Sequence, residues 1–74
     1  MTQREYVIII HPEETGGYWT GVPALPGCGS QGETVEEAVA MTRDAIQGYL
    51  ASLKKQGEPI PDERDIVLKV SVAA

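Results

Sequence analysis

The sequence predicts an α+β fold: a three-stranded antiparallel sheet followed by one long helix and a fourth strand, with the helix packed on one face of the sheet. Three observations support this prediction. Short runs of β-branched and aromatic residues, separated by Gly and Pro, occupy the first part of the chain, residues 34–56 have helical spacing, and apolar and polar residues alternate from Ile66 to Val72. The 74 residues are enough for one domain, which we expect to span residues 1–74.

The first strand is expected from Tyr6 to Ile10, a continuous run of β-branched and aromatic residues. Because the run does not alternate with polar residues, both faces of this strand are apolar. His11 and Pro12 are expected to end it, since Pro has no N–H to donate to a neighbouring strand. The residues from Glu13 to Gly17 are polar and rich in Gly, which is typical of a hairpin connection.

The second strand is expected from Tyr18 to Val22, where alternation leaves Trp19 on the side away from the core. Pro and Gly residues then turn the chain, and Gly27 can supply the positive φ that a type II turn needs after Pro. A third, weaker strand is expected from Cys28 to Glu33. Its glycines reduce its packing, so we place it at an edge of the sheet.

Residues 34–56 are expected to form the helix. Thr34 and Glu37 have the spacing of a capping box, in which the hydroxyl accepts a hydrogen bond from the first turn and the carboxylate reaches back. Gly57, followed closely by two prolines, should end the helix. Gly48 in the helix interior should cost about 1 kcal/mol relative to Ala. The apolar stripe of this helix consists of Val35, Ala38, Val39, Thr42, Ile46, Tyr49, Leu50 and Leu53.

One helix covers only one face of this sheet. If it packs over the apolar side of the final strand, one set of first-strand side chains remains bare, either Tyr6, Ile8 and Ile10 or Val7 and Ile9. An apolar patch of this kind usually marks an interface, so we expect a homodimer or homotetramer. The predicted oligomer interface is formed by Tyr6, Val7, Ile8, Ile9 and Ile10. The alternative is a monomer in which the Trp side chain and the Pro/Gly corner fold back over this face.

The net charge of −5 argues against direct binding to nucleic acid, because such binding depends on clustered Lys and Arg. A basic partner suits this charge better. The longest apolar run, Tyr6 to Ile10, is too short to cross a bilayer or to act as a signal peptide, so we expect no membrane association and a reducing, cytoplasmic setting. One Cys and one His provide neither a disulfide nor a metal site, and we expect no metal and no cofactor.

The sequence offers no strong catalytic constellation, and we predict that the protein is not an enzyme. Cys28 and His11 are candidates for a nucleophile and its base. No third group at an identifiable spacing orients them, and the simpler interpretation is a small buried Cys and a His at a strand end. A two-metal nuclease needs converging carboxylates, and the first strand has none. The glycines also lack the Lys-Ser/Thr ending of a phosphate-binding loop.

Short motifs are distributed over nearly the whole chain, from Tyr6 to Val72, and the most specific combination is Leu-Pro-Gly-Cys with a helix that ends in Gly-x-Pro-x-Pro. The residues of these motifs are Gly17, Tyr18, Val22, Pro23, Leu25, Pro26, Gly27, Cys28, Gln31, Gly32, Thr34, Glu36, Glu37, Ala38, Ala45, Ile46, Tyr49, Leu50, Leu53, Gly57, Pro59, Ile60 and Pro61. Together they resemble the N-terminal domain of HicB-type antitoxins.

The resemblance implies a role in a bacterial or archaeal toxin-antitoxin pair, in which HicB-like proteins bind and inactivate HicA, a small basic ribonuclease that cleaves mRNA. It also implies assembly into dimers or tetramers. Many HicB proteins continue into a DNA-binding segment, and because this sequence ends at Ala74 without one, direct DNA binding is not expected. Two residues depart from the family pattern. Gly29 stands where a bulkier strand residue is expected, and Trp19 stands where a smaller polar residue is expected.

The leading hypothesis is therefore an acidic, antitoxin-like interaction protein. Exposed carboxylates would steer a cationic partner, and apolar side chains would anchor it. The predicted partner-binding residues are Glu13, Glu14, Trp19, Leu25, Pro26 and Glu33. A simpler interpretation of the glutamates is a solvated surface. The alternative function is a stand-alone regulatory or small-molecule-binding domain with no toxin partner, whose pocket lies at the Pro/Gly corner.

Overall fold

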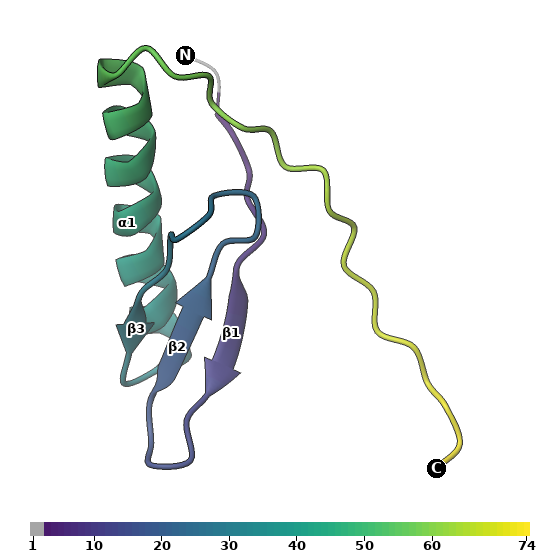
Figure 1. Ribbon diagram of the computed structural model, residues 1–74. Coiled ribbons are helices and arrows are strands. Elements are labelled where there is room, and N and C mark those ends of the chain that lie inside the picture. The colour runs from purple at the N-terminus through teal and green to yellow at the C-terminus, as the bar shows by residue number, and fades with distance from the viewer. Residues whose placement is uncertain (1–2) are drawn as a thin grey trace.

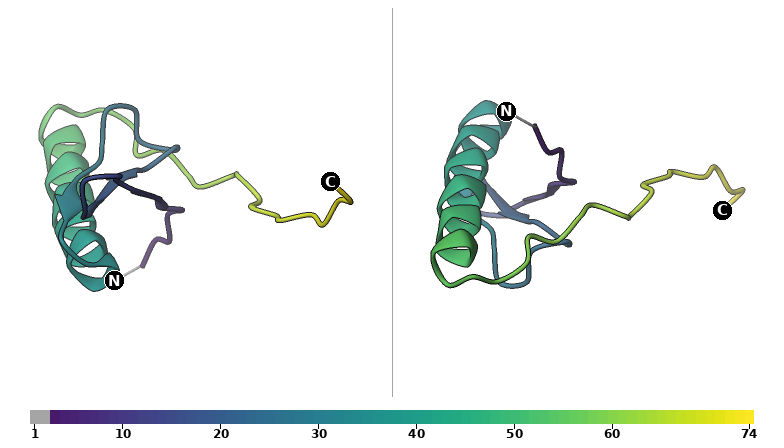
Figure 2. Two further views of the ribbon diagram at one scale, coloured as in Figure 1. Left: turned by 90° about the horizontal axis from the view of Figure 1, so that it is seen from below. Right: turned by 90° about the horizontal axis from the view of Figure 1, so that it is seen from above.

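A computed structural model describes residues 3–74 and shows a three-stranded antiparallel sheet with one long helix against it (Figure 1). The order along the chain is β1 (Ile9–Pro12), β2 (Tyr18–Gly21), β3 (Gln31–Gly32) and α1 (Val35–Lys55). Strand β2 is central, with β1 and β3 at the two edges. Helix α1 packs against β2 and β3, on one face of the sheet (Figure 2). The α+β class and this part of the predicted architecture are confirmed.

Strand β1 begins and ends later than the sequence predicts, and Pro12 is part of it, opposite Tyr18. The hydrogen-bond pattern explains why a proline is tolerated. The N–H of Thr20 donates to the carbonyl of Ser30 at 2.8 Å, on the β3 side of β2. Ile10 lies opposite Thr20, and these two residues therefore form a pair without mutual hydrogen bonds. The N–H and C=O groups of Ile10 point away from β2. Pro12, two residues further on, has the same orientation and loses no sheet hydrogen bond.

The predicted hairpin and corner are both present. The hairpin after β1 closes through the N–H of Glu13, which donates to the carbonyl of Gly17 at 2.9 Å. At the corner, the N–H of Cys28 donates to the carbonyl of Leu25 at 3.0 Å, and Gly27 has a φ of +79°. These values describe the expected type II turn. Strand β3 is also at an edge, as predicted, and is only two residues long.

Close main-chain approaches explain the glycines around β3. A Cβ atom on Gly29 would lie far inside contact distance of the carbonyl oxygen of Thr20, so the bulkier residue expected there does not fit. A Cβ atom on Gly32 would lie 2.5 Å from the N atom of Ala38 in α1. The absence of side chains at these two positions lets residues 29–32 approach β2 and α1 closely.

Both ends of α1 follow the sequence signals. At the N-terminus, the hydroxyl of Thr34 accepts from the N–H of Glu37 at 3.1 Å, and the Glu37 carboxylate accepts from the N–H of Glu33 at 2.8 Å. At the C-terminus, Gly57 has a φ of +72° and its N–H donates to the carbonyl of Lys54 at 3.1 Å, which matches a Schellman motif. Helix α1, which is the one helix within residues 3–74, does not combine the length and the apolarity that a membrane span requires.

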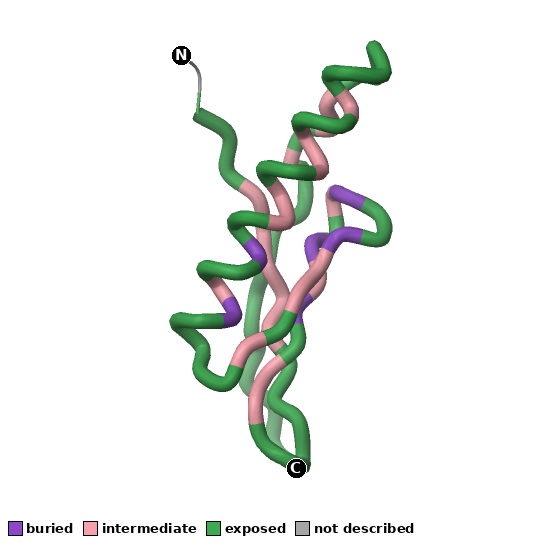
Figure 3. Tube along the Cα trace, turned by 90° about the vertical axis from the view of Figure 1, so that its left-hand side faces the viewer, coloured by how far each residue is buried: buried purple, intermediate pink, exposed green. Residues whose placement is uncertain are grey.

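The core is small and lies between α1 and β2 together with the corner that follows β2 (Figure 3). Leu25, at the corner, and Ala38, in the helix, are both 0% exposed. The other buried residues are Thr20, Val22, Cys28 and Thr42. Partly buried apolar residues from β1's N-terminal side and from α1 complete it, namely Tyr6, Ile8, Ala45, Ile46, Tyr49 and Leu50.

Two buried threonines join the sheet to the helix through a hydrogen-bonded chain. The hydroxyl of Thr42 donates to the carbonyl of Ala38 at 2.6 Å and lies within hydrogen-bond distance of the hydroxyl of Thr20. The Thr20 oxygen in turn accepts from the N–H of Ser30 at 2.9 Å. Each hydroxyl is therefore satisfied although neither is accessible to water, which fixes how α1 sits on β2.

The predicted fourth strand is not present. The C-terminal arm, residues 65–74, is extended but pairs with no strand among the described residues, and it runs away from the rest of the molecule (Figures 1 and 2). Its alternating apolar side chains are 79–86% exposed, and they are Ile66, Leu68, Val70 and Val72. The expectation that α1 packs over these four side chains is wrong for this structure. After Gly57 the chain contacts residues 4–7 through residues 61–63 and then runs away from the sheet and the helix.

Candidate interaction surfaces

The sheet face opposite α1 is open and carries an aromatic stack. Trp19 lies directly opposite His11 in the β1–β2 pairing, and their rings stack with centroids 4.0 Å apart and planes 9° apart. Trp19 is nevertheless 44% exposed. Since Tyr6 and Ile8 pack against the core, strand alternation puts Val7 and Ile9 on this open face. Of the two apolar sets that the sequence offered, the open face therefore carries the smaller one.

An acidic groove of about 460 Å³ lies at the hairpin end of the sheet, between the hairpin, β3 and the first turns of α1. Three of the predicted partner-binding residues, Glu13, Trp19 and Glu33, line it together. Glu37 and Met41 complete the set that we call the acidic groove. Its lining contains three carboxylates and neither Lys nor Arg. This arrangement suits a cationic side chain or a basic surface that reaches in from solvent.

Sequence reasoning missed Glu37 and Met41 for different reasons. The capping box explained Glu37, and the structure confirms that role, but the same carboxylate also faces the groove. Met41 falls outside the apolar stripe of the helix and is 49% exposed. The signal that would have found both is their spacing, because residues four apart in the first turns of a helix share a face.

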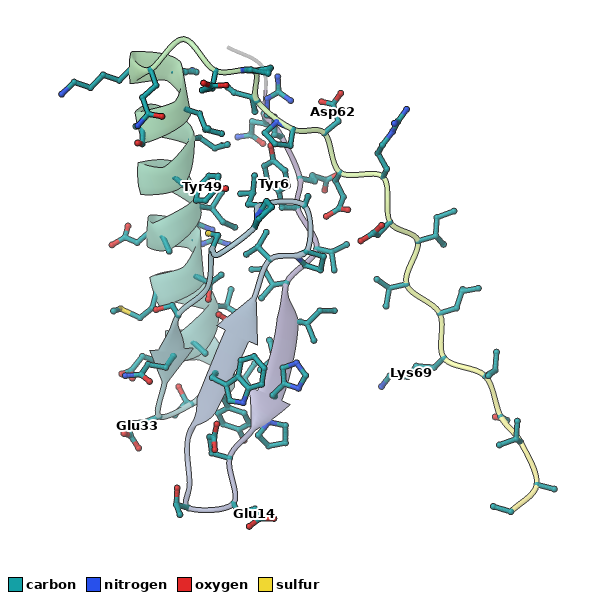
Figure 4. The ribbon with its side chains drawn as sticks, viewed as in Figure 1. Tyr6, Glu14, Glu33, Tyr49, Asp62 and Lys69 are labelled. Atoms are coloured by element: carbon teal, nitrogen blue, oxygen red, sulfur yellow. The ribbon has the colours of Figure 1, made fainter. Side chains whose placement is uncertain are left out.

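The remaining predicted contacts are separated from the groove. Glu14 is exposed in the hairpin turn, and Figure 4 shows it at the tip, away from Glu33. Leu25 is 0% exposed and belongs to the core, so its proposed role as a partner anchor is corrected. Pro26 is exposed, and its carbonyl accepts a hydrogen bond from the hydroxyl of Tyr49 at 2.9 Å. The Leu25 side chain fills the corner, and the hydrogen bond from Tyr49 to Pro26 connects the corner to α1.

The candidate catalytic pair is not assembled. Cys28 is buried in the core on the α1 side of the sheet, and burial raises the pKa of its thiol, which disfavours the nucleophilic thiolate. His11 lies on the other face, against Trp19. The sheet therefore separates the two side chains. Cys28 acts as a small packing residue, as the simpler interpretation of the sequence held.

Comparison with known proteins decides the family. The sequence pattern of a family described as the HicB-like antitoxin of bacterial toxin-antitoxin systems matches residues 6–71. The chain belongs to the HicB-like antitoxin family. The resemblance found in the turn and helix motifs is thereby confirmed. Membership in an antitoxin family implies a toxin partner in general and suggests a role other than catalysis.

Individual relatives of this HicB-like chain come from archaea and bacteria. A UPF0150 protein of Thermoplasma acidophilum is 46% identical over 70 residues, which cover 95% of this chain and 99% of the relative. A UPF0150 protein of Synechocystis is 40% identical over 67 residues, with 90% and 85% of the two chains covered. Antitoxin HicB 1 of Photorhabdus laumondii is 36% identical over 56 residues, which cover 76% of this chain but only 36% of that protein.

Proposed function

We propose that this protein neutralises a small basic HicA-type toxin that cleaves mRNA, by placing the acidic groove and the exposed Trp19 against the toxin's basic surface. The observation that carries the proposal is the groove itself, whose lining combines three carboxylates with two aromatic residues, Tyr18 and Trp19, and contains no basic residue. Family membership supports a toxin as the partner. Because such a toxin attacks mRNA, the proposed place of action is the cytoplasm.

Charge and burial assign different tasks to the residues of the groove. Glu13 and Glu33 are exposed, so they mainly raise the association rate and set the orientation of a cationic partner. Trp19 already has one ring face covered by His11 and keeps 44% of its surface open. A rigid, half-exposed Trp is the residue type that most often dominates an interface. The complex should therefore weaken as salt concentration rises.

Self-association is part of the same proposal. A homodimer or homotetramer would cover apolar surface that this chain leaves open, including Val7 and Ile9 on the open face. Direct nucleic-acid binding is not part of it, because the net charge is −5. The rival function, a small-molecule pocket at the Pro/Gly corner, loses its support because Leu25 fills that corner.

Titration of toxin activity tests the proposal. A small basic chain encoded beside this protein is purified, and its RNA cleavage is measured against increasing amounts of this protein. We expect stoichiometric inhibition by the wild type. The variant Glu13→Lys/Glu33→Lys should inhibit at least about tenfold more weakly, because two carboxylates of the groove become cations.

The matched control is a double charge reversal outside the groove. Glu58→Lys together with Glu36→Lys makes the same change of net charge at exposed positions that do not line the groove. It should inhibit nearly as well as the wild type. Equal weakening by both double variants would show that inhibition depends on net charge and not on the carboxylates of the groove. Failure of the wild-type protein to inhibit would refute the proposed function.

A further inference from the structure

The C-terminal arm has the chemistry of a strand without the contacts of one. From Ile66 to Val72 the backbone is extended, and the apolar side chains alternate with Lys69 and Ser71. Val67 on the second side is 59% exposed. A regular apolar face of this kind, left in water, favours pairing with another sheet edge.

The residues just before the arm, 61–63, which we call its root, are held against residues 4–7 of the same chain, which we call the first segment. The Glu63 carboxylate accepts from the N–H of Val7 at 2.6 Å and from the N–H of Asp65 at 3.0 Å. The side chain thus takes the place that a main-chain carbonyl of a paired strand would take. Just before it, the Tyr6 hydroxyl donates to the carbonyl of Pro61.

A salt bridge between Arg4 and Asp62 at 2.8 Å adds to this crossing point. Figure 4 shows Tyr6 and Asp62 near this crossing point, with Lys69 far out along the arm. The root therefore crosses the first segment, and beyond Glu63 the arm diverges from β1 (Figure 1). Pairing of the arm with its own β1 would require this crossing to be undone.

The outer edge of β1 offers the complementary groups. Because Ile10 stands opposite Thr20 in a pair without mutual hydrogen bonds, its N–H and C=O point outward, and those of Ile8 have the same orientation in an extended chain. Neither residue has a strand neighbour on that side in the described chain. Pro12 closes the edge at its far end, since it has no N–H.

A groove with both apolar and polar lining, the latter including Arg4, Arg43 and Lys54, adjoins this edge on the helix side. It has a volume of about 530 Å³ and lies between residues 3–8 and α1. Ile8, Ile46 and Leu50 contribute apolar side chains to its lining, and all three are only partly buried. The helix packs mainly on β2 and β3, so Tyr6 and Ile8 on this side are only partly buried.

We infer that the arm of one copy of this chain adds as a fourth strand to the outer edge of β1 in a second copy, and that the exchange is reciprocal. The arm's alternation then turns Ile66, Leu68 and Val70 into the groove beside α1 of the second copy, and Lys69 and Ser71 to the other face. The inference deepens the proposed self-association and gives it a defined contact. It needs no toxin, so its failure leaves the proposed toxin binding untouched.

Sedimentation velocity of the full chain, from low micromolar concentration upward, tests the exchange. We expect a dimer for the wild type. Val70→Glu replaces an apolar side chain on the inner face of the arm, which would contact Ile8, Ile46 and Leu50, with a charged one, and it should raise the dimer dissociation constant at least about a hundredfold, leaving a monomer. Ser71→Glu adds the same charge on the other face of the arm and should remain dimeric. Circular dichroism checks that α1 is kept in both variants.

A complementation experiment separates exchange from other dimers. Chemical synthesis can place an N-methyl group on the amide of Ile10, which blocks the outer edge and spares the β1–β2 hydrogen bonds. This chain and Val70→Glu should each be monomeric alone. When they are mixed, the intact arm of the first pairs with the intact edge of the second, so a heterodimer is expected.

Three outcomes would overturn the inference. A wild-type chain that remains monomeric at every concentration shows that the arm does not bind a second copy of the chain. A Val70→Glu chain that dimerises as the wild type does shows that the dimer uses another surface. A mixture that gives no heterodimer, from two chains that are each monomeric, shows that arm and edge do not meet between copies.

Discussion

The body of the molecule, from β1 to the end of α1, and the C-terminal arm have equally clear apolar patterns, but only the body buries its apolar face. In β2 the alternation is realised, because Thr20 is 5% exposed and Trp19 on the other side is 44% exposed. In the arm it is more regular still, yet Ile66 is 86% exposed and Leu68 is 80% exposed. Alternation therefore predicts which side chains share a face, whereas the path of the chain decides whether anything covers that face.

The largest effect is expected where the body is tightest. Gly32→Ala would put a Cβ atom 2.5 Å from the N atom of Ala38 and 2.8 Å from its Cα, both of which are main chain and cannot turn aside. We expect a loss of about 3 kcal/mol in the free energy of unfolding, measured by urea denaturation. The loss should be the same in the Val70→Glu background, because it belongs to the body alone.

Gly48→Ala is the control for this substitution. Gly48 is exposed in the middle of α1, and no neighbouring atom lies within 4 Å of the added Cβ. The replacement should stabilise the protein by about 1 kcal/mol, since Ala is the better helix former. Equal destabilisation by Gly32→Ala and Gly48→Ala would show that the close contact of Gly32 with α1 is not the cause of the stability loss.

A smaller loss is expected at the threonine pair that joins the sheet to α1. Thr42→Val keeps the volume but removes the hydroxyl, so the Thr20 hydroxyl loses a buried partner and about 2 kcal/mol of stability should be lost. Thr42→Ser keeps the hydroxyl and removes a methyl group, which should cost about 1 kcal/mol. A greater loss for Ser than for Val would show that packing, and not the hydrogen-bonded chain, dominates here.

The smallest effect is expected at the boundary between body and arm, and it depends on pH. The N–H groups of Val7 and Asp65 lower the pKa of the Glu63 carboxyl below its usual value of 4.5. Because the pKa is lower in the folded state, the contact stabilises the root of the arm above the usual carboxyl range and is lost as the pH falls through the lowered pKa.

The amide resonance of Val7 reports this titration by NMR. Its chemical shift should change with a midpoint below 4.5 in the wild type and should stop titrating in Glu63→Gln. Glu58→Gln, at an exposed position outside the contact, should leave the Val7 titration as it is. A Val7 midpoint at or above the usual carboxyl value would contradict the contact.

Much of the fold follows from the sequence because local chemistry decides it. Thr34, Glu37 and Gly57 mark both ends of α1, and Gly27 marks the type II turn, since each requires only near neighbours. The end of β1 was mispredicted because the effect of Pro12 depends on which side of the strand its nitrogen faces. That orientation is a property of the β1–β2 register, which local sequence does not contain.

The candidate site was predicted in part, for a similar reason. Residue type and exposure were sufficient to propose Glu13, Trp19 and Glu33, which the structure brings into one groove. They were misleading for Leu25, because an apolar residue in a Pro/Gly corner points inward or outward according to the packing of α1. The missing fourth strand has the same origin, since no local signal states whether a strand pairs within its own chain.

Amide hydrogen exchange of the C-terminal arm tests the central claim most directly. If a second copy supplies the cover, the amides of residues 66–72 are protected in the wild type, and their protection increases with protein concentration. In Val70→Glu the same amides exchange freely, while those of α1 remain protected. Arm amides that exchange at the unprotected rate at every concentration, or protection that does not depend on concentration, would contradict the claim.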